Sequence, residues 1–148
     1  MIQYLLALLA AHAGLYFGMA LALISPEEIG PGRKHFVRVQ HVLLLIMLAL
    51  LFYSSGPVVA VPLAVLTAIL FRHQEAAYAL LSLIFLAMYD SGFAVHSGFL
   101  IFLYGLPAGT LASENKHAWQ AFSYLARHYL WFILLGIVLY LPRAAFLP

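Results

Sequence analysis

The sequence AAYALLSLIFLAMYDSGFAVHSGFLIFLYGL, from Ala76 to Leu106, carries one charged side chain, Asp90, in an otherwise apolar run. A hydrocarbon core of about 30 Å is crossed by about 20 helical residues, so this run is too long for one upright span. Tilt alone would accommodate it only near or beyond about 40°, the upper end of what membrane helices show. We therefore expect the run to break, and Asp90-Ser91-Gly92 has the residue types of a turn.

The whole chain has the same character, because 66% of its 148 residues are hydrophobic, 8% are charged and the mean hydropathy is +1.01. A soluble core of this size cannot bury so much apolar surface, so the bilayer must solvate most side chains. No segment alternates between polar and apolar residues, as the strands of a membrane β-barrel do. The sequence therefore predicts an all-α, polytopic integral membrane helix bundle, forming a single transmembrane domain over 1–148 in the cell membrane.

The number of spans depends on two broken apolar runs. Residues 4–24 are predicted as a first span that is retained, because no basic segment precedes it as in a signal peptide. The run 39–71 is interrupted by Ser54-Ser55-Gly56-Pro57, and a last helix is expected from Ser113-Glu114 to Leu141. If both broken runs are hairpins, the chain has six short spans, whereas kinked single spans would give four. The positive-inside rule favours six, with the basic loops in the cytoplasm and both termini outside.

Other glycine, proline and aromatic residues predict helix ends and interfaces. Ser25-Pro26-Glu27-Glu28 has the composition of a helix start, and Gly30-Pro31-Gly32 is expected to end that helix after about one turn. Gly105-Leu106-Pro107-Ala108-Gly109 is expected to end the opening run. In the last helix, Trp119, Tyr124, Tyr129 and Trp131 are predicted to form an interfacial aromatic belt, with Tyr140 at the opposite interface.

The two broken runs resemble each other at an offset of 36 residues. At this offset Phe52-Tyr53-Ser54-Ser55-Gly56 aligns with Met88-Tyr89-Asp90-Ser91-Gly92. Paired, interrupted apolar segments are the sequence sign of an internal repeat in transporters. Few positions are identical, so chance similarity between apolar sequences is the alternative. If the repeat is real, Asp90 stands where its counterpart has Ser54.

Asp90 is the first candidate functional residue, because an Asp in a span costs about 2.5 to 3.5 kcal/mol to insert. We expect a transport-type protein in which Asp90 binds a proton or a cation, with His96, Ser54 and His41 as further candidate substrate- or ion-binding residues. The competing interpretation makes Asp90 a helix N-cap at a hairpin tip, where it would meet water. His41 and His96 could also ligate a haem from two helices, an interpretation that no motif supports.

A second hypothesis is a membrane-embedded enzyme acting on a lipid or isoprenoid phosphate. The cations Arg33, Lys34, His35 and Arg38 precede an apolar span and could hold a phosphate at the membrane surface, with His41 or Asp90 as acid or base. Cysteine is absent, so thiolate chemistry is excluded, and no metal site is predicted. The net charge of only +2 is typical of basic residues that set the orientation of a protein in the membrane. No nucleic-acid partner is predicted.

A third hypothesis is a non-catalytic subunit of a membrane complex. Small residues recur every four positions in the first span, at Ala10, Gly14, Gly18 and Ala22. Such a stripe lets another helix approach closely. Besides the lipid bilayer, the expected partner is therefore a second copy of the chain or another membrane subunit, bound through this stripe.

Overall fold

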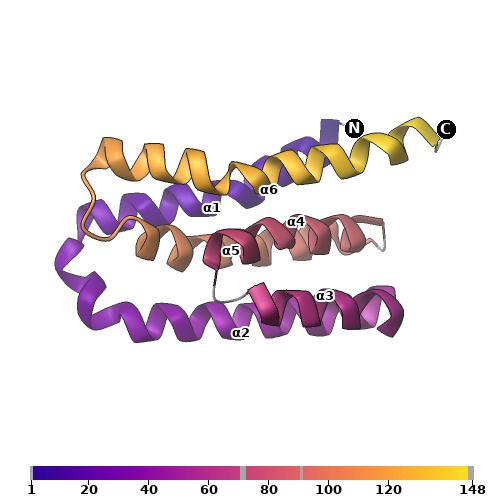
Figure 1. Cartoon of the computed structure of the whole chain (residues 1–148), viewed down its shortest axis with the longest axis horizontal. Helices are drawn as coiled ribbons and strands as arrows, with labels where there is room; N and C mark the ends of the chain where they lie inside the picture. The colour runs from indigo at the N-terminus through magenta and orange to yellow at the C-terminus, as the bar shows by residue number, and fades with distance from the viewer. Residues whose placement is uncertain (1, 71–72, 91, 147–148) are drawn as a thin grey trace.

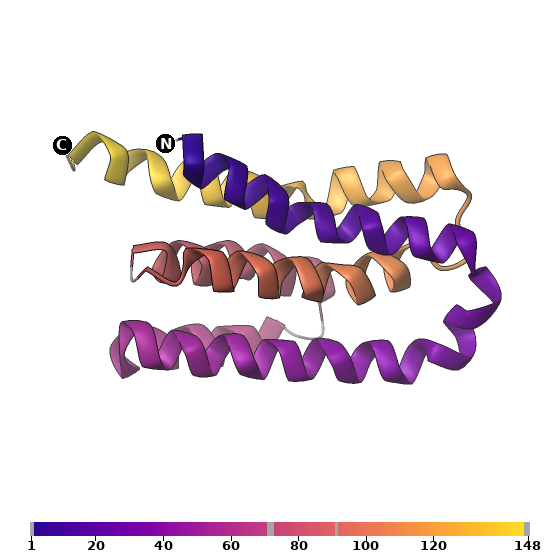
Figure 2. The same cartoon turned by 180° about the vertical axis from the view of Figure 1, so that it is seen from behind.

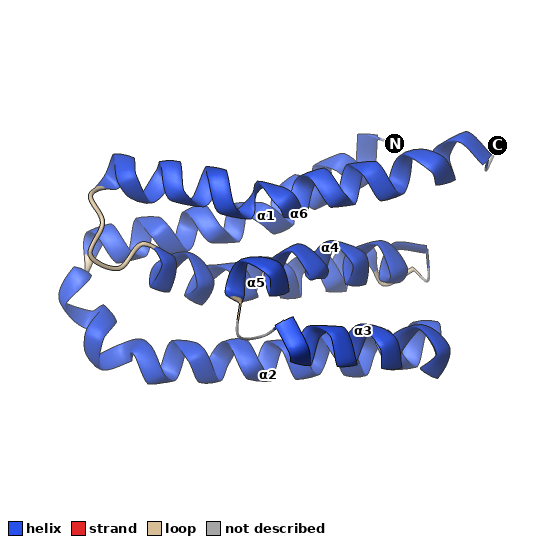
Figure 3. Ribbon diagram, viewed as in Figure 1, coloured by secondary structure: helices blue, strands red, loops and turns tan. Residues whose placement is uncertain are grey.

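The computed structural model describes residues 2–70, 73–90 and 92–146, with the side chains of Asp90 and of residues 143–146 outside this description. The described residues form six α-helices and one short 3-10 helix, and they contain no strand (Figure 3). The elements are α1 (Ile2–Ile24), η1 (Pro26–Glu28), α2 (Ile29–Ser55), α3 (Pro57–Leu70), α4 (Gln74–Asp90), α5 (Ala94–Ala112) and α6 (Ala118–Phe146). The prediction of an all-α protein is confirmed.

The helices form three layers of two, each layer antiparallel (Figures 1 and 2). α1 and α6 make one outer layer, α2 and α3 make the other, and α4 and α5 lie between them. The middle layer is the sequence from Ala76 to Leu106 almost in full. Its long apolar run, with few polar positions, suits helices that are covered on both sides.

Four segments are long and apolar enough to cross a membrane: Ile2–Ile24, Pro26–Ser55, Ala94–Ala112 and Ala118–Pro142. α3 and α4 are apolar but have 14 and 17 residues, fewer than the roughly 20 that usually span a hydrocarbon core. Each broken run is thus a hairpin and not one kinked helix. The start of α1 and the end of α6 lie at the same end of the bundle (Figure 1).

Both hairpin turns contain a glycine in a conformation that L side chains rarely adopt. Gly56 has a φ of 72° and Gly92 a φ of 81°. Gly56 ends α2, and Pro57 begins α3, where a missing N–H costs nothing. The predicted breaks at these two glycines are confirmed, and they occur at equivalent positions of the aligned segments.

Three expected helix ends are wrong. α2 begins at Ile29 and continues through Gly30-Pro31-Gly32, because Pro31 lies in the first turn, where no helical N–H bond is required. α5 continues through Pro107 to Ala112, and Ser113 is its C-cap and not the start of the next helix. α6 begins at Ala118 and continues through Pro142 to Phe146. Packing accounts for the continuation of α5, because Pro107 and the residues after it are buried.

The small-residue stripe packs inside the chain. Cβ atoms added to Gly14 and Gly18 would lie 2.1 and 2.0 Å from the carbonyl oxygens of Phe102 and Leu106 on α5. On the other side, α5 contributes Gly105 and Gly109, whose added Cβ atoms would meet the α1 backbone at 2.8 and 2.0 Å. The prediction of close helix packing is confirmed, but the neighbour of Gly14, Gly18 and the buried Ala22 is the chain's own α5, and only Ala10 is exposed.

Candidate functional site

Most charged side chains lie toward one end of the bundle, where Glu27, Glu28 and Glu114 accompany five cations. Arg33, Lys34 and Arg38 on α2, Lys116 in the loop between α5 and α6, and Arg127 on α6 lie toward the end opposite the chain termini (Figure 1). We call this end the basic end. Arg33 donates a hydrogen bond to Glu114 at 3.0 Å, which joins α2 to the loop between α5 and α6. An ion pair this exposed contributes little to stability, about 0 to 1 kcal/mol.

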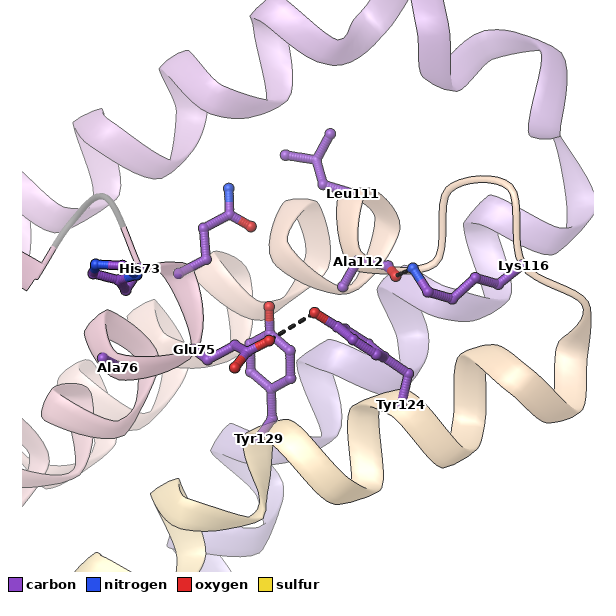
Figure 4. A pocket seen from close by; sticks show the side chains of 9 residues that line it. His73, Glu75, Ala76, Leu111, Ala112, Lys116, Tyr124 and Tyr129 are labelled. Carbon is purple, nitrogen blue, oxygen red and sulfur yellow. Dashed lines mark hydrogen bonds between the residues drawn. The ribbon is translucent and has the colours of Figure 1, made fainter.

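A polar cluster lies beside the basic end, where α4 begins. Glu75, the second residue of α4, accepts a hydrogen bond from the Tyr124 hydroxyl at 2.7 Å (Figure 4). Its second carboxylate oxygen lies 3.1 Å from His128 Nδ1. Both partners are on α6, inside its candidate span. Tyr124 and His128 follow Ala118 by 6 and 10 residues, which corresponds to about 9 and 15 Å along the helix. The carboxylate therefore lies below the end of the bundle, on a side chain that is 41% exposed.

Glu75 lies at the N-terminus of a helix and near a lysine. The N-terminus of a helix carries partial positive charge, and Glu75 lies in the first turn of α4. Lys116 lies nearby, donating to the Ala112 carbonyl at 2.5 Å and resting 4.4 Å from the centre of the Tyr124 ring. Lys116 over the Tyr124 ring and the Tyr124 hydroxyl bonded to Glu75 thus make these three side chains one connected polar group.

Two pockets open on either side of Glu75. One, of about 600 Å³, lies between the start of α4, the end of α5 and α6 (Figure 4). The other, of about 330 Å³, lies between α4 and α6 beside Arg127 and Trp131. The first is lined by His73, Gln74, Glu75, Ala76, Leu111, Ala112, Lys116, Tyr124 and Tyr129. A small polar ligand or a cation could thus reach the carboxylate from either side.

Buried polar groups continue inward from this cluster. Tyr78, one turn after Glu75 on α4, is fully buried, and its ring lies 5.4 Å from that of Tyr129 and 5.9 Å from that of His12. Among the described residues, neither the Tyr78 hydroxyl nor His12 Nδ1 has a hydrogen-bond partner. Buried polar atoms are nearly always bonded to protein or to ordered water, so these two atoms are exceptional in the core.

The opposite end of the interior is closed by aromatic rings. Tyr4 stacks on Tyr140 at 4.1 Å, meets Tyr89 edge-on at 4.9 Å, and contacts Phe85 at 5.4 Å. The Tyr4 hydroxyl donates to the Gly136 carbonyl at 3.0 Å. The ring of Tyr140, predicted to lie at the opposite interface, packs against Tyr4 of another helix.

The residues predicted around Asp90 lie near the end of the bundle that carries the termini. Asp90 is the last residue of α4, so its backbone lies at a turn and not in the middle of a helix. Its predicted role as N-cap of the next helix is wrong, since that position is occupied by Phe93. Ser54 is the second-last residue of α2, and its hydroxyl bonds to the Leu51 carbonyl at 3.2 Å. The side chain of Asp90, and Arg72 and Ser91 as a whole, lie outside the described residues.

His41 and His96 are not brought to one centre. His96 is exposed in the first turn of α5, near the turn after α2, as the ring contact between Tyr53 and Phe93 indicates. His41 is exposed near the middle of α2, 14 residues or about 20 Å before its end. The geometry gives no support to haem ligation by this pair, and no group of three or more metal-ligating side chains was found in the described part of the chain.

The four predicted phosphate-binding residues occupy the first turns of α2. Arg33, Lys34, His35 and Arg38 are all exposed. A pocket of about 620 Å³ lies at this end, between η1 and the loop that carries Glu114, Lys116 and His117. Comparisons of the chain with protein-family models, curated proteins and solved structures gave no match, so the function must be argued from these sites alone.

Proposed function

We propose that this chain is a small multi-pass membrane protein of the transport type that binds a proton or a small cation at Glu75. The observation that carries the proposal is the position of Glu75, an acid bonded to two side chains of a candidate spanning helix. Ionisable groups inside membrane spans are costly and are usually kept for ion pathways or proton relays.

The surface of the bundle supports a membrane location. Large apolar side chains are exposed on the outer helices, for example Val58 at 84% on α3 and Leu45 at 66% on α2. Such side chains are unfavourable in water but suit lipid tails. With six helices and the basic end in the cytoplasm, both termini would lie outside, in agreement with the positive-inside rule. The similar turns at Gly56 and Gly92 support the repeat of two hairpins.

Glu75 is preferred to Asp90 because its carboxylate has bonded partners and a pocket on each side. Asp90 stays a prediction, with His96 and Ser54 near the same end of the bundle. The two acids can be separated by chemistry, since a hydrophobic carbodiimide reacts with a carboxyl group that is protonated and reachable from the lipid.

Carbodiimide labelling of the protein in bilayers is expected to modify Glu75 in preference to Glu27, Glu28 and Glu114. Added cations are expected to lower the labelling of Glu75, because they compete for the same carboxylate. Raised pH is expected to lower it as well, because it removes the proton that the reaction requires. Peptide mass spectrometry locates the label and measures its extent. Labelling of Asp90 without labelling of Glu75 would assign the cation site to Asp90, at the other end of the bundle. Equal labelling of all acids would contradict a cation site at Glu75.

The second candidate function is that of an enzyme acting on a lipid or isoprenoid phosphate, favoured by the four exposed basic residues of α2 at the end of the bundle where the pocket of about 620 Å³ lies. Replacing Arg33 and Lys34 together with glutamine is expected to abolish phosphate release from a polyprenyl phosphate, because the anion loses both charges. Glu114→Gln is the control, since it breaks the ion pair of Arg33 and keeps both cations. Absence of phosphate release by the unaltered protein would reject this function.

A further inference from the structure

We infer that the pocket beside Glu75 binds a cation of the ammonium type, such as a protonated primary amine, in competition with the ammonium group of Lys116. The inference rests on the proposed function and names the chemical class of the bound cation. Its basis is the position of Lys116 Nζ, which contacts two other residues that line the pocket, Ala112 and Tyr124.

The ammonium group of Lys116 lies between two groups that attract a cation. It donates a hydrogen bond to the carbonyl oxygen of Ala112 at 2.5 Å and lies 4.4 Å from the centre of the Tyr124 ring. Ala112 is the last residue of α5, and the C-terminus of a helix carries partial negative charge. The face of a tyrosine ring attracts cations as well. Both groups would act in the same way on the ammonium group of a ligand.

The position of the ammonium group is connected to Glu75. The hydroxyl of Tyr124 donates to the Glu75 carboxylate at 2.7 Å, so the ring that contacts Lys116 also holds the acid (Figure 4). Glu75, Tyr124 and Lys116 all line the pocket of about 600 Å³, a volume within the usual range for small-molecule sites. An ammonium ligand that replaces Lys116 would therefore share the pocket with the carboxylate of the proposed cation site.

Lys116 can leave this position without a movement of the helices. It belongs to the loop between α5 and α6, its side chain is partly exposed, and four carbons join its ammonium group to the backbone. A lysine near a helix C-terminus often bonds the last carbonyls of that helix. Lys116 differs from such a cap in lining two pockets, the second of about 620 Å³ at the basic end. Rotation of its side chain toward the second pocket would open the first to a ligand.

The contacts of Lys116 indicate an ammonium group and not a divalent metal ion as the ligand. A protonated primary amine carries the same –NH₃⁺ group as lysine, so it can make the same hydrogen bond and the same contact with the ring. Divalent ions such as Ca²⁺ and Mg²⁺ are bound by about six or more oxygen atoms. Within the described ranges, no group of three or more His, Cys, Asp or Glu side chains could hold a metal ion.

Uptake of radiolabelled methylammonium by proteoliposomes tests the inference. Lys116→Met removes the ammonium group and keeps a long, flexible side chain. It is expected to lower the half-saturating concentration of methylammonium about tenfold, the change that follows if Lys116 occupies the position about nine-tenths of the time. Lys116→Arg is the matched control, because a guanidinium group keeps the charge, donates hydrogen bonds and binds to aromatic faces. It is expected to keep the half-saturating concentration of the unaltered protein.

Uptake of radiolabelled sodium by the same vesicles tests the class of cation. The half-saturating concentration is expected to be lower for methylammonium than for sodium, because sodium has no N–H group to donate to the Ala112 carbonyl. Equal values, or the reverse order, would overturn the assignment to an ammonium-type cation. Equal half-saturating concentrations of methylammonium in Lys116→Met and in the unaltered protein would overturn the competition by Lys116.

The outcomes for Glu75→Gln separate this inference from the proposed function. Unaltered uptake of both cations in Glu75→Gln would overturn the proposed function and the inference together. Loss of sodium uptake in this variant, with no methylammonium uptake by the unaltered protein, would overturn the inference alone.

If Lys116→Met fails to fold, ¹⁵N NMR of the unaltered protein decides. The chain has two lysines, and Lys34 is exposed on α2. The side-chain resonance of Lys116 is expected to move when methylammonium is added, while that of Lys34 stays in place. A Lys116 resonance that does not move would overturn the inference.

Discussion

Glu75→Gln is expected to lower the uptake of protons or small cations by proteoliposomes about tenfold or more, a loss equivalent to about 1.4 kcal/mol. Glutamine has nearly the same shape and can still accept the bond from Tyr124, so the fold should persist. What is lost is the negative charge and the ability to bind a proton. The measurement is the initial uptake rate at equal amounts of reconstituted protein.

Glu27→Gln serves as the matched control, because Glu27 is an exposed acid on η1 and its substitution changes the net charge by the same amount. It is expected to leave the rate unaltered. Tyr124→Phe removes one hydrogen bond but keeps the negative charge and the proton-binding group of Glu75, so it should have a smaller effect than Glu75→Gln. Equal rates for Glu75→Gln and Glu27→Gln would contradict the assignment.

Gly18→Ala is expected to destabilise the bundle by more than about 3 kcal/mol, since overpacking that side chains can relieve already costs about 1 to 3 kcal/mol. The added methyl group would lie 2.0 Å from the carbonyl oxygen of Leu106, an atom of the backbone of a neighbouring helix. That contact cannot be relieved by a side-chain rotation, so α1 and α5 would have to separate. Unfolding in mixed micelles, followed by circular dichroism, measures the change.

Gly98→Ala is the control for this substitution, because its added methyl group would meet only the Phe85 side chain, at 3.5 Å, and the Ala7 carbonyl, at 4.0 Å. These are ordinary van der Waals distances, and alanine is favoured over glycine in a helix by about 0.5 to 1 kcal/mol. The variant should be as stable as the unaltered protein or slightly more stable. Similar stability of Gly18→Ala and Gly98→Ala would show that the helices do not pack this closely.

The architecture was largely predictable from the sequence, because its strongest signals are local. The apolar run from Ala76 to Leu106 is the middle layer, and its predicted turn falls at Gly92. Gly56-Pro57 likewise marks a turn. Both signals depend on backbone conformation, which a glycine or a proline restricts within a few residues. The same rules failed at Pro107 and Pro142, where packing decides whether the helix continues.

The candidate site was not predictable in the same way. In the sequence, Glu75 stands in a short polar segment between two apolar runs, and Tyr124 is predicted to lie in an interfacial aromatic belt. Their hydrogen bond joins residues 49 positions apart, so no local pattern encodes it. One signal was available, namely that the segment after α3 contains no helix breaker and yet carries an acid between two apolar helices. Such an acid must find a partner when the helices fold together.

The close contact of α1 and α5 also limits how the molecule can move. Gly14, Gly18, Gly105 and Gly109 bring two backbones together without intervening side chains, so neither helix can slide without steric collision. These two helices should therefore move as one rigid body. Any change in the shape of the Glu75 cluster would then come from displacement of α6, which supplies both of its hydrogen-bond partners and follows a loop containing Asn115 at a φ of 59°.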